Sequence, residues 1–248
     1  MPNWLLERRF HRYPIQLPLA YKPGGATSGS GRGGWTCDLS AGGACLELGE
    51  RLQPQAVVQV RLRTVHGPIE VGAQVVWAGE PTSPTGGIPH GVIFGELTPE
   101  QLQALQPLPS SPSVAPKARV RLPVDFAVTC QPKRPVRAMV QGRAGDMSRG
   151  GMLLRFPEAL APGTEVEITL HTTTGPVRLP GEIVWADRSG TAGPLYPPPV
   201  YEVFGETVWL DLPERRTPEE PPVRHGMQFS NLEPSVSLSL GQLLAESA

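Results

Sequence analysis

Apolar and polar residues alternate along several short stretches of the chain, and this alternation is the period of a half-buried β-strand. In residues 58–63 the apolar side chains are Val58, Val60 and Leu62, and polar residues separate them. Residues 15–21, 69–75 and 165–170 alternate in the same way. With six such short strands in each half, we predict an all-β fold of two six-stranded barrels, because closing a small sheet removes its exposed edges.

The two halves of the chain are copies of one another. Residues 38–43, Asp-Leu-Ser-Ala-Gly-Gly, recur at 146–151 as Asp-Met-Ser-Arg-Gly-Gly, and an apolar strand ends in a tryptophan 39 residues after each aspartate, at Trp77 and Trp185. Because the motif and the tryptophan are separated by the same number of residues in both halves, the chain is interpreted as a duplication. We predict a first domain at 1–106, a linker at 107–116 that is rich in Pro and Ser, and a second domain at 117–248 with a Pro-rich insertion at about 187–224.

Each copy is predicted to end in a helix. Thr98 and Gln101 have the spacing of a capping box, with proline at the first helical position between them. Leu102 and Leu105 would then face the first barrel. The counterpart in the second copy is expected at about 234–245.

The composition narrows the class of protein. The chain has 30 prolines and 28 glycines, and this content argues against a mainly helical fold. The glycine-rich residues 31–34 are interpreted as a flexible hairpin loop. The net charge of -1 gives no general attraction to nucleic acid or to an anionic membrane, so neither is an expected partner. No apolar run has the length of a signal peptide core or a membrane span, and three cysteines are too few for a disulfide framework. We therefore expect a soluble, cytoplasmic protein.

A basic segment precedes the first predicted barrel. Its sequence is Arg8-Arg9-Phe10-His11-Arg12, which contains an R-x-x-x-R spacing. A D-x-S-x-x-G motif lies further along the chain, at residues 38–43. Together with the Leu-Pro strand, the strand ending in tryptophan and the terminal helix, this order resembles the PilZ family of cyclic di-GMP receptors. The resemblance covers nearly the whole chain, twice. It implies a non-enzymatic six-stranded barrel without a cofactor, which changes conformation on binding the nucleotide and so acts on an effector protein that the sequence does not identify.

The resemblance also implies the binding residues. The family's positions fall on Arg8, Arg12, Asp38, Ser40 and Gly43, with Arg9 and Gly42 as further contacts. Arginine presents a planar fork of donors that matches phosphate oxygens or the guanine O6 and N7 atoms. The aspartate can accept from the N1–H and N2–H edge of a guanine, and the serine adds a hydroxyl. The two glycines are expected to allow positive φ and a close approach of the ligand.

The second copy departs from the pattern. Its R-x-x-x-R positions fall on Ser113 and Lys117, neither of which offers a bidentate fork, although Asp146, Ser148 and Gly151 persist. We therefore expect at most a weak second site, and we favour the alternative that the aspartate and serine only cap a hairpin turn there. For the first copy we favour nucleotide binding over the alternative of a solvated basic segment.

Other candidate residues are given structural interpretations. Trp77 and Trp185 are expected in the core or at the barrel rim, and His90 and His225 recur at one repeat position without further metal ligands at suitable spacing. Cys37 and Cys45 flank the signature turn and could approach one another across a hairpin, although buried thiols are the default. No catalytic motif is present in the sequence. The competing hypothesis is a ligand-independent scaffold, whereas the resemblance implies signal transduction by a bacterial second messenger in motility, adhesion or polysaccharide output.

Overall fold

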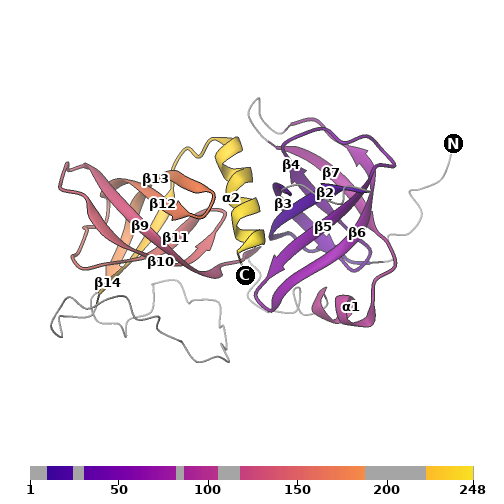
Figure 1. The fold of residues 1–248 in the computed structure, drawn as a ribbon, viewed down its shortest axis with the longest axis horizontal. Helices are drawn as coiled ribbons and strands as arrows, with labels where there is room; N and C mark the ends of the chain where they lie inside the picture. The colour runs from indigo at the N-terminus through magenta and orange to yellow at the C-terminus, as the bar shows by residue number, and fades with distance from the viewer. Residues whose placement is uncertain (1–9, 25–30, 82–86, 106–117, 188–221, 248) are drawn as a thin grey trace. The chain divides into compact units, whose positions relative to one another are not determined.

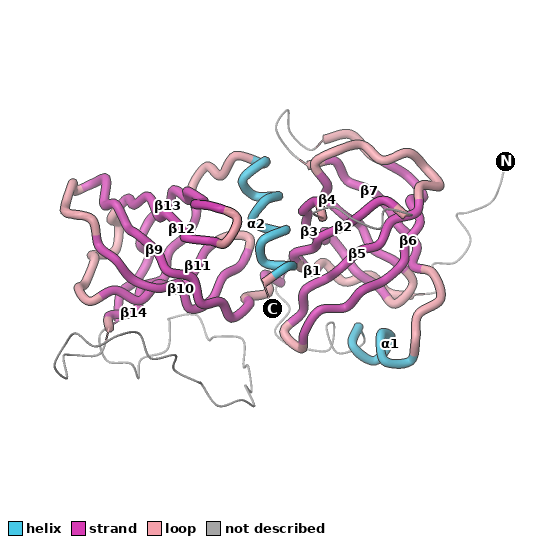
Figure 2. The backbone as a smooth tube through the Cα atoms, in the orientation of Figure 1, coloured by secondary structure: helices cyan, strands magenta, loops and turns pink. Residues whose placement is uncertain are grey.

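A computed structural model describes residues 10–24, 31–81, 87–105, 118–187 and 222–247. Most of these residues lie in strands joined by short loops, as Figure 2 shows. The predicted linker and most of the predicted insertion lie outside the described residues.

The first barrel closes in the strand order β2-β3-β4-β7-β6-β5, with every neighbouring pair antiparallel (Figure 1). Its strands are β2 (Pro18–Pro23), β3 (Arg32–Ser40), β4 (Gly43–Leu48), β5 (Val57–Thr64), β6 (Gly67–Ala78) and β7 (Ile88–Phe94). A short parallel pair, β1 (Ile15–Gln16) with β8 (Ala118–Arg119), and the helix α1 (Pro99–Leu105) accompany the barrel.

The second barrel closes in the order β10-β11-β14-β13-β12-β9, which is the order of the first barrel for the equivalent strands of the repeat. Its strands are β9 (Leu122–Arg134), β10 (Val140–Ser148), β11 (Gly151–Phe156), β12 (Glu165–Thr172), β13 (Gly175–Asp187) and β14 (Val223–Phe229), and the helix α2 (Pro234–Glu246) follows. The predicted fold of two six-stranded barrels, with a helix after each, is confirmed.

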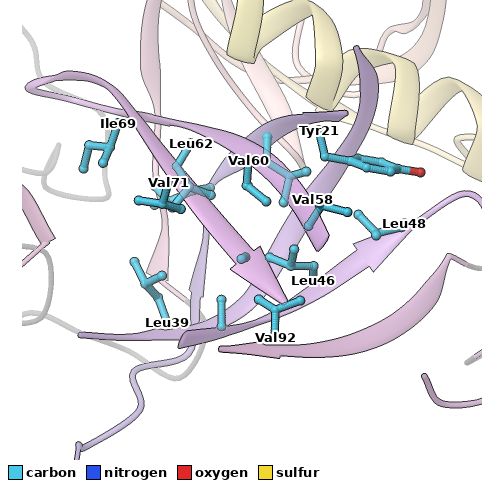
Figure 3. Packing of buried hydrophobic residues seen from close by; sticks show 14 of the residues in the cluster. Tyr21, Leu39, Leu46, Leu48, Val58, Val60, Leu62, Ile69, Val71 and Val92 are labelled. Atoms are coloured by element: carbon cyan, nitrogen blue, oxygen red, sulfur yellow. The ribbon is translucent and has the colours of Figure 1, made fainter. Parts of the chain in front are cut away.

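The core of the first barrel is formed by the alternating residues that the sequence singled out. Val58, Val60 and Leu62 of β5 are no more than 1% exposed, and Ile69 and Val71 of β6 are also buried. Figure 3 shows these side chains converging inside the barrel from several strands. Burying a branched aliphatic side chain contributes about 1.5–3 kcal/mol, so each of these residues stabilises the barrel by about that amount.

The capping box of α1 is present. The backbone N–H of Thr98 donates to the side-chain Oε1 of Gln101 at 2.7 Å, and the N–H of Gln101 donates to Oγ1 of Thr98 at 3.3 Å. Leu105 is buried and Leu102 half-buried, as expected for residues that face the barrel.

Contacts divide the described chain into two units, and α2 belongs to the unit that contains the first barrel. The helix packs against β2 and β3, and its Ser237 carbonyl accepts a hydrogen bond from Nε1 of Trp35 at 2.8 Å. This packing explains why Ala20 of β2 is buried, although the alternation placed it on the outer face.

The interpretation of residues 31–34 as a loop was wrong, because Gly33 and Gly34 lie within β3 and pair with β2. A Cβ on Gly33 would lie 2.1 Å from the carbonyl oxygen of Leu238 in α2. A Cβ on Gly241 of α2 would lie 2.3 Å from the carbonyl oxygen of Gly34. These glycines therefore let a helix and a strand approach backbone to backbone.

His90 and His225 are both fully buried and hold equivalent loops. Nε2 of His90 accepts the backbone N–H of Leu52 at 3.0 Å, and Nε2 of His225 accepts that of Leu160 at 3.0 Å. Burial lowers the pKa of each imidazole below its usual value. Both rings therefore act as neutral hydrogen-bond acceptors within the fold.

Candidate functional site

The segment ahead of β1 lies against the end of β3. Tyr13 and Leu39 form an isolated antiparallel bridge with two backbone hydrogen bonds, of 2.9 Å and 3.0 Å. This bridge fixes the backbone next to Arg12, the second arginine of the R-x-x-x-R motif. Arg8 and Arg9 lie outside the described residues.

Arg12 and Asp38 meet at the surface of the first barrel. Nη1 of Arg12 lies 2.7 Å from Oδ1 of Asp38, and both side chains are about one third exposed. The backbone N–H of Cys45 donates to the same carboxylate oxygen at 3.0 Å. Among the described residues both hydrogen bonds end on Oδ1, which leaves Oδ2 available to a further donor. The two motifs that lie 26 residues apart in sequence are thus joined in one site.

The remaining signature residues support the turn between β3 and β4. The buried hydroxyl of Ser40 donates to the carbonyl of Gly43 at 3.0 Å. A Cβ on Gly43 would lie 2.2 Å from the carbonyl oxygen of Val92 in β7, and one on Gly42 would lie 2.7 Å from Cδ2 of Phe10. The expectation of positive φ at these glycines was wrong, since neither has it. The absent side chains instead make room for β7 and for the ring of Phe10.

An exposed tryptophan lies on the same face, where the alternation of apolar and polar residues alone did not place it. A Cβ on Gly91 would lie 2.0 Å from Nε1 of Trp77, so the indole rests directly on this glycine. Trp77 is 44% exposed, which excludes a core position. The strand register pairs Asp38 with Cys45, Cys45 with Gly91 and Gly91 with Trp77. The aspartate and the indole are therefore the two ends of one row across β3, β4, β7 and β6.

An apolar row lies beside the first one. The register pairs Gly43 with Ile93, Ile93 with Gln74 and Gln74 with Val57. Ile93 and Val57 are each about half exposed, although both are large and apolar. The outer face of β5, β6 and β7 therefore adds apolar surface to the ion pair and the indole.

A model of the PilZ domain family matches the chain twice, at residues 6–108 and 117–203. The chain belongs to the PilZ domain family. Each matched region contains one copy of the D-x-S-x-x-G motif, and the first also contains Arg8, Arg9 and Arg12.

Solved structures of PilZ proteins are similar to this chain at low sequence identity. The PilZ domain of CeSA from a cellulose-synthesizing bacterium is 22% identical, and the match covers 40% of this chain and 94% of that one, with a TM-score of 0.32. YcgR of Escherichia coli in complex with c-di-GMP is 11% identical over 92% of this chain and 82% of its own, with a TM-score of 0.35. The Borreliella burgdorferi PlzA protein in complex with c-di-GMP is 10% identical over 91% of this chain and 87% of its own, with a TM-score of 0.31. No curated protein matches the chain.

The second PilZ domain keeps the turn of the first. The hydroxyl of Ser148 accepts the N–H of Gly150 at 3.3 Å, and a Cβ on Gly151 would lie 2.2 Å from the carbonyl oxygen of Met227. Trp185 rests on Gly226 as Trp77 rests on Gly91. The serine and the last glycine of the signature thus have a role in the fold of both domains.

The arginine positions separate the two PilZ domains. In the first, Arg12 reaches the signature aspartate, whereas the aligned Ser113 and Lys117 of the second lie outside the described residues. Within the described part of the chain, no group of three or more His, Cys, Asp or Glu side chains could hold a metal ion. None of the helices described is long and apolar enough to cross a membrane.

Proposed function

We propose that the chain is a non-catalytic, cytoplasmic receptor for cyclic di-GMP, and that the first PilZ domain binds the nucleotide. The observation that carries this proposal is the ion pair of Arg12 with Asp38 at one end of a row that has the exposed indole of Trp77 at the other. A cationic fork, an acidic acceptor and an aromatic face are the three kinds of group that a ligand with phosphates and guanines requires.

Each group has a separate role in the proposed complex. The free oxygen of Asp38 accepts from the N1–H and N2–H edge of a guanine, and Arg12 binds a phosphate or the O6 and N7 atoms. Trp77 offers a flat surface on which a base stacks, which is worth about 1–3 kcal/mol per base. Ser40 acts through the turn, because its hydroxyl is already bonded to Gly43. Arg8, Arg9 and Gly42 are further proposed contacts.

The ion pair also suggests how binding becomes a signal. Arg12 is paired with Asp38 at 2.7 Å, so a ligand that binds at Asp38 has to draw the guanidinium away or share it. Because Arg12 lies next to Tyr13, whose backbone is bonded to β3, a new position of the arginine side chain changes the surface around Asp38. A ligand that prefers one of two conformations shifts their populations. We propose that this change alters binding to an effector protein in motility, adhesion or polysaccharide output.

Titration calorimetry with cyclic di-GMP tests the proposal. Arg12→Ala should raise the Kd by about 10- to 100-fold, since a charge-assisted hydrogen bond contributes about 1.5–3 kcal/mol. The matched control is Arg61→Ala, which removes an arginine of the same domain whose partner is Glu70 at 3.3 Å, on strands β5 and β6. Lys117→Ala should also bind as the wild type does.

Two results would count against the proposal. Equal losses in Arg12→Ala and Lys117→Ala would show that the assignment of the site to the first domain is wrong. If the wild-type chain gives no heat at high micromolar nucleotide, the ligand-independent scaffold becomes the better account.

A further inference from the structure

Two thiols lie together beside the signature aspartate. The register pairs Thr36 with Leu46 and Asp38 with Cys45, and it shifts between Thr36 and Asp38. Cys37 is therefore the extra residue of a β-bulge, in which two residues of one strand oppose one residue of the next. Cys37 and Asp38 both lie opposite Cys45.

The spacing of such a pair suits a disulfide. The Cα partner of Cys45 in the register is Asp38, and the adjacent bulge residue Cys37 has its thiol within hydrogen-bond reach of the Cys45 sulfur. A disulfide needs its two Cβ atoms about 3.5–4.5 Å apart, so neighbouring thiols on opposed strands are suitably placed. Both cysteines are free thiols in the structure. Cys37 is half-buried, so a small oxidant can reach the pair from the surface, whereas Cys45 is buried.

The environment of the thiols favours reaction at one of them. A hydrogen bond from the Cys37 thiol lowers the pKa of Cys45 and raises the pKa of Cys37. Arg12 lowers the pKa of Cys45 further, while Asp38, Glu47 and burial oppose this effect. A thiolate is the form that attacks an oxidant, and a neighbouring thiol is what resolves the product.

The fold itself does not require these thiols. At the equivalent positions of the second barrel stand Gly145 and Leu153, on the same pair of strands around the same turn. The third cysteine, Cys130 of β9, is fully buried, and burial raises its pKa to about 12. The pair therefore differs from an ordinary buried thiol in position, access and environment.

We propose that Cys37 and Cys45 form a reversible oxidation site, in which a peroxide joins them in a disulfide next to Asp38. The Cys45 thiolate attacks one peroxide oxygen and becomes a sulfenic acid, while the O–O bond breaks and the other oxygen leaves as water. The Cys37 sulfur then displaces the hydroxyl as a second water and the S–S bond forms. Two thiols lose two electrons and two protons, hydrogen peroxide takes them up, and a dithiol reductant reverses the change.

The disulfide has a consequence for the neighbouring site, and this part rests on the proposed function. The N–H of Cys45 holds Oδ1 of Asp38 at 3.0 Å, and Asp38 follows Cys37 directly in β3. Joining the sulfurs draws the bulge toward β4 and displaces the carboxylate. Nucleotide affinity should fall by about three- to tenfold, which corresponds to the loss of one hydrogen bond.

The test exposes the full native chain to hydrogen peroxide and measures intact mass and reactive thiols. The wild type and Cys130→Ser should each lose about 2 Da and two thiols, and dithiothreitol should restore both. Cys37→Ser and Cys45→Ser should form no internal disulfide. Products that carry only added oxygen, disulfides between chains, or oxidation of Cys130 at the rate of the pair would overturn the proposal.

Calorimetry on the same samples separates this proposal from the proposed function. If the reduced chain binds cyclic di-GMP and the oxidised chain binds it about three- to tenfold more weakly, both hold. If the reduced chain does not bind at all, the receptor function fails while the mass result still decides the oxidation site. Equal affinity of the two forms would overturn the link between the disulfide and Asp38.

Discussion

Replacing Gly91 by alanine tests the role of the exposed tryptophan. The new Cβ would lie 2.0 Å from Nε1, 2.3 Å from Cε2 and 2.7 Å from Cδ1 of Trp77. An ordinary contact needs at least 3.4 Å, so the edge of the indole has to move outward by about 1.4 Å. The ring of Trp77, which belongs to β6, then no longer rests on Gly91 of β7.

The magnitude follows from two separate costs. Overpacking a well-packed site costs about 1–3 kcal/mol of stability. Stacking of a base on an aromatic ring is worth about 1–3 kcal/mol, and a displaced ring keeps only part of it, so the Kd for cyclic di-GMP should rise by about five- to tenfold. Calorimetric titration measures the affinity, and urea unfolding measures the stability.

The second domain supplies a matched control. A Cβ on Gly226 would lie 1.9 Å from Nε1 of Trp185, which is nearly the same clash in the domain that lacks the arginine motif. Gly226→Ala should therefore lose a similar amount of stability and keep the wild-type affinity. A Gly91→Ala variant that binds as the wild type does, or a Gly226→Ala variant that loses as much affinity, would refute the assignment of Trp77 to the site.

Further predictions concern the stability of the fold. The free energy of unfolding should decrease as the pH falls below 6.5, the ordinary pKa of an imidazole, because His90 and His225 take up protons in the unfolded chain while burial keeps their pKa lower in the folded chain. The slope is at most about 1.4 kcal/mol per pH unit for each histidine, and a variant with glutamine at both positions should lack it. Gln55 has a φ of 70° where the repeat has Gly163 at 84°, so Gln55→Gly should raise the urea midpoint by the equivalent of about 0.5–1 kcal/mol without changing the m-value. Gly241→Ala should lower the melting temperature, since its Cβ would lie 2.3 Å from a carbonyl oxygen of β3.

The fold could be predicted from the sequence because its signals are local and occur twice. Alternation in 58–63 placed Val58, Val60 and Leu62 in the core, where all three are found. The capping box of Thr98 and Gln101 depends on two residues of one turn, and both of its hydrogen bonds are present. The repeat then gave the second barrel with the same strand order.

The remaining features depend on contacts between segments that are distant in sequence. Gly33 and Gly34 resemble a loop by composition. The helix α2, distant in sequence, explains why β3 needs Gly33, because a Cβ there would lie 2.1 Å from the carbonyl oxygen of Leu238, and β4 explains Gly34, whose Cβ would lie 2.6 Å from the carbonyl oxygen of Glu47. Trp77 ends an apolar strand, so alternation alone suggests a core or rim position. A signal for its true position was available in the recurrence of the tryptophan with Gly91 and with Gly226.

Part of the candidate site could be inferred by resemblance before any geometry was known. The pairing of Arg12 with Asp38 agrees with the joint role expected of these residues, whereas the buried Ser40 hydroxyl bonds within its own turn. Alternation and turn patterns describe the direction of a side chain, and they carry no information about which hydrogen-bond partner a hydroxyl selects. Nucleotide contacts at these positions stay a prediction.

The most direct test of the receptor account is a crystal structure of the full chain grown with excess cyclic di-GMP. We predict nucleotide on the outer face of the first barrel, with a guanine edge bonded to Asp38, the Arg12 guanidinium within hydrogen-bond distance of the ligand, and a base stacked on Trp77. A structure in which this face is empty and Arg12 still pairs only with Asp38, as at 2.7 Å here, would contradict the account.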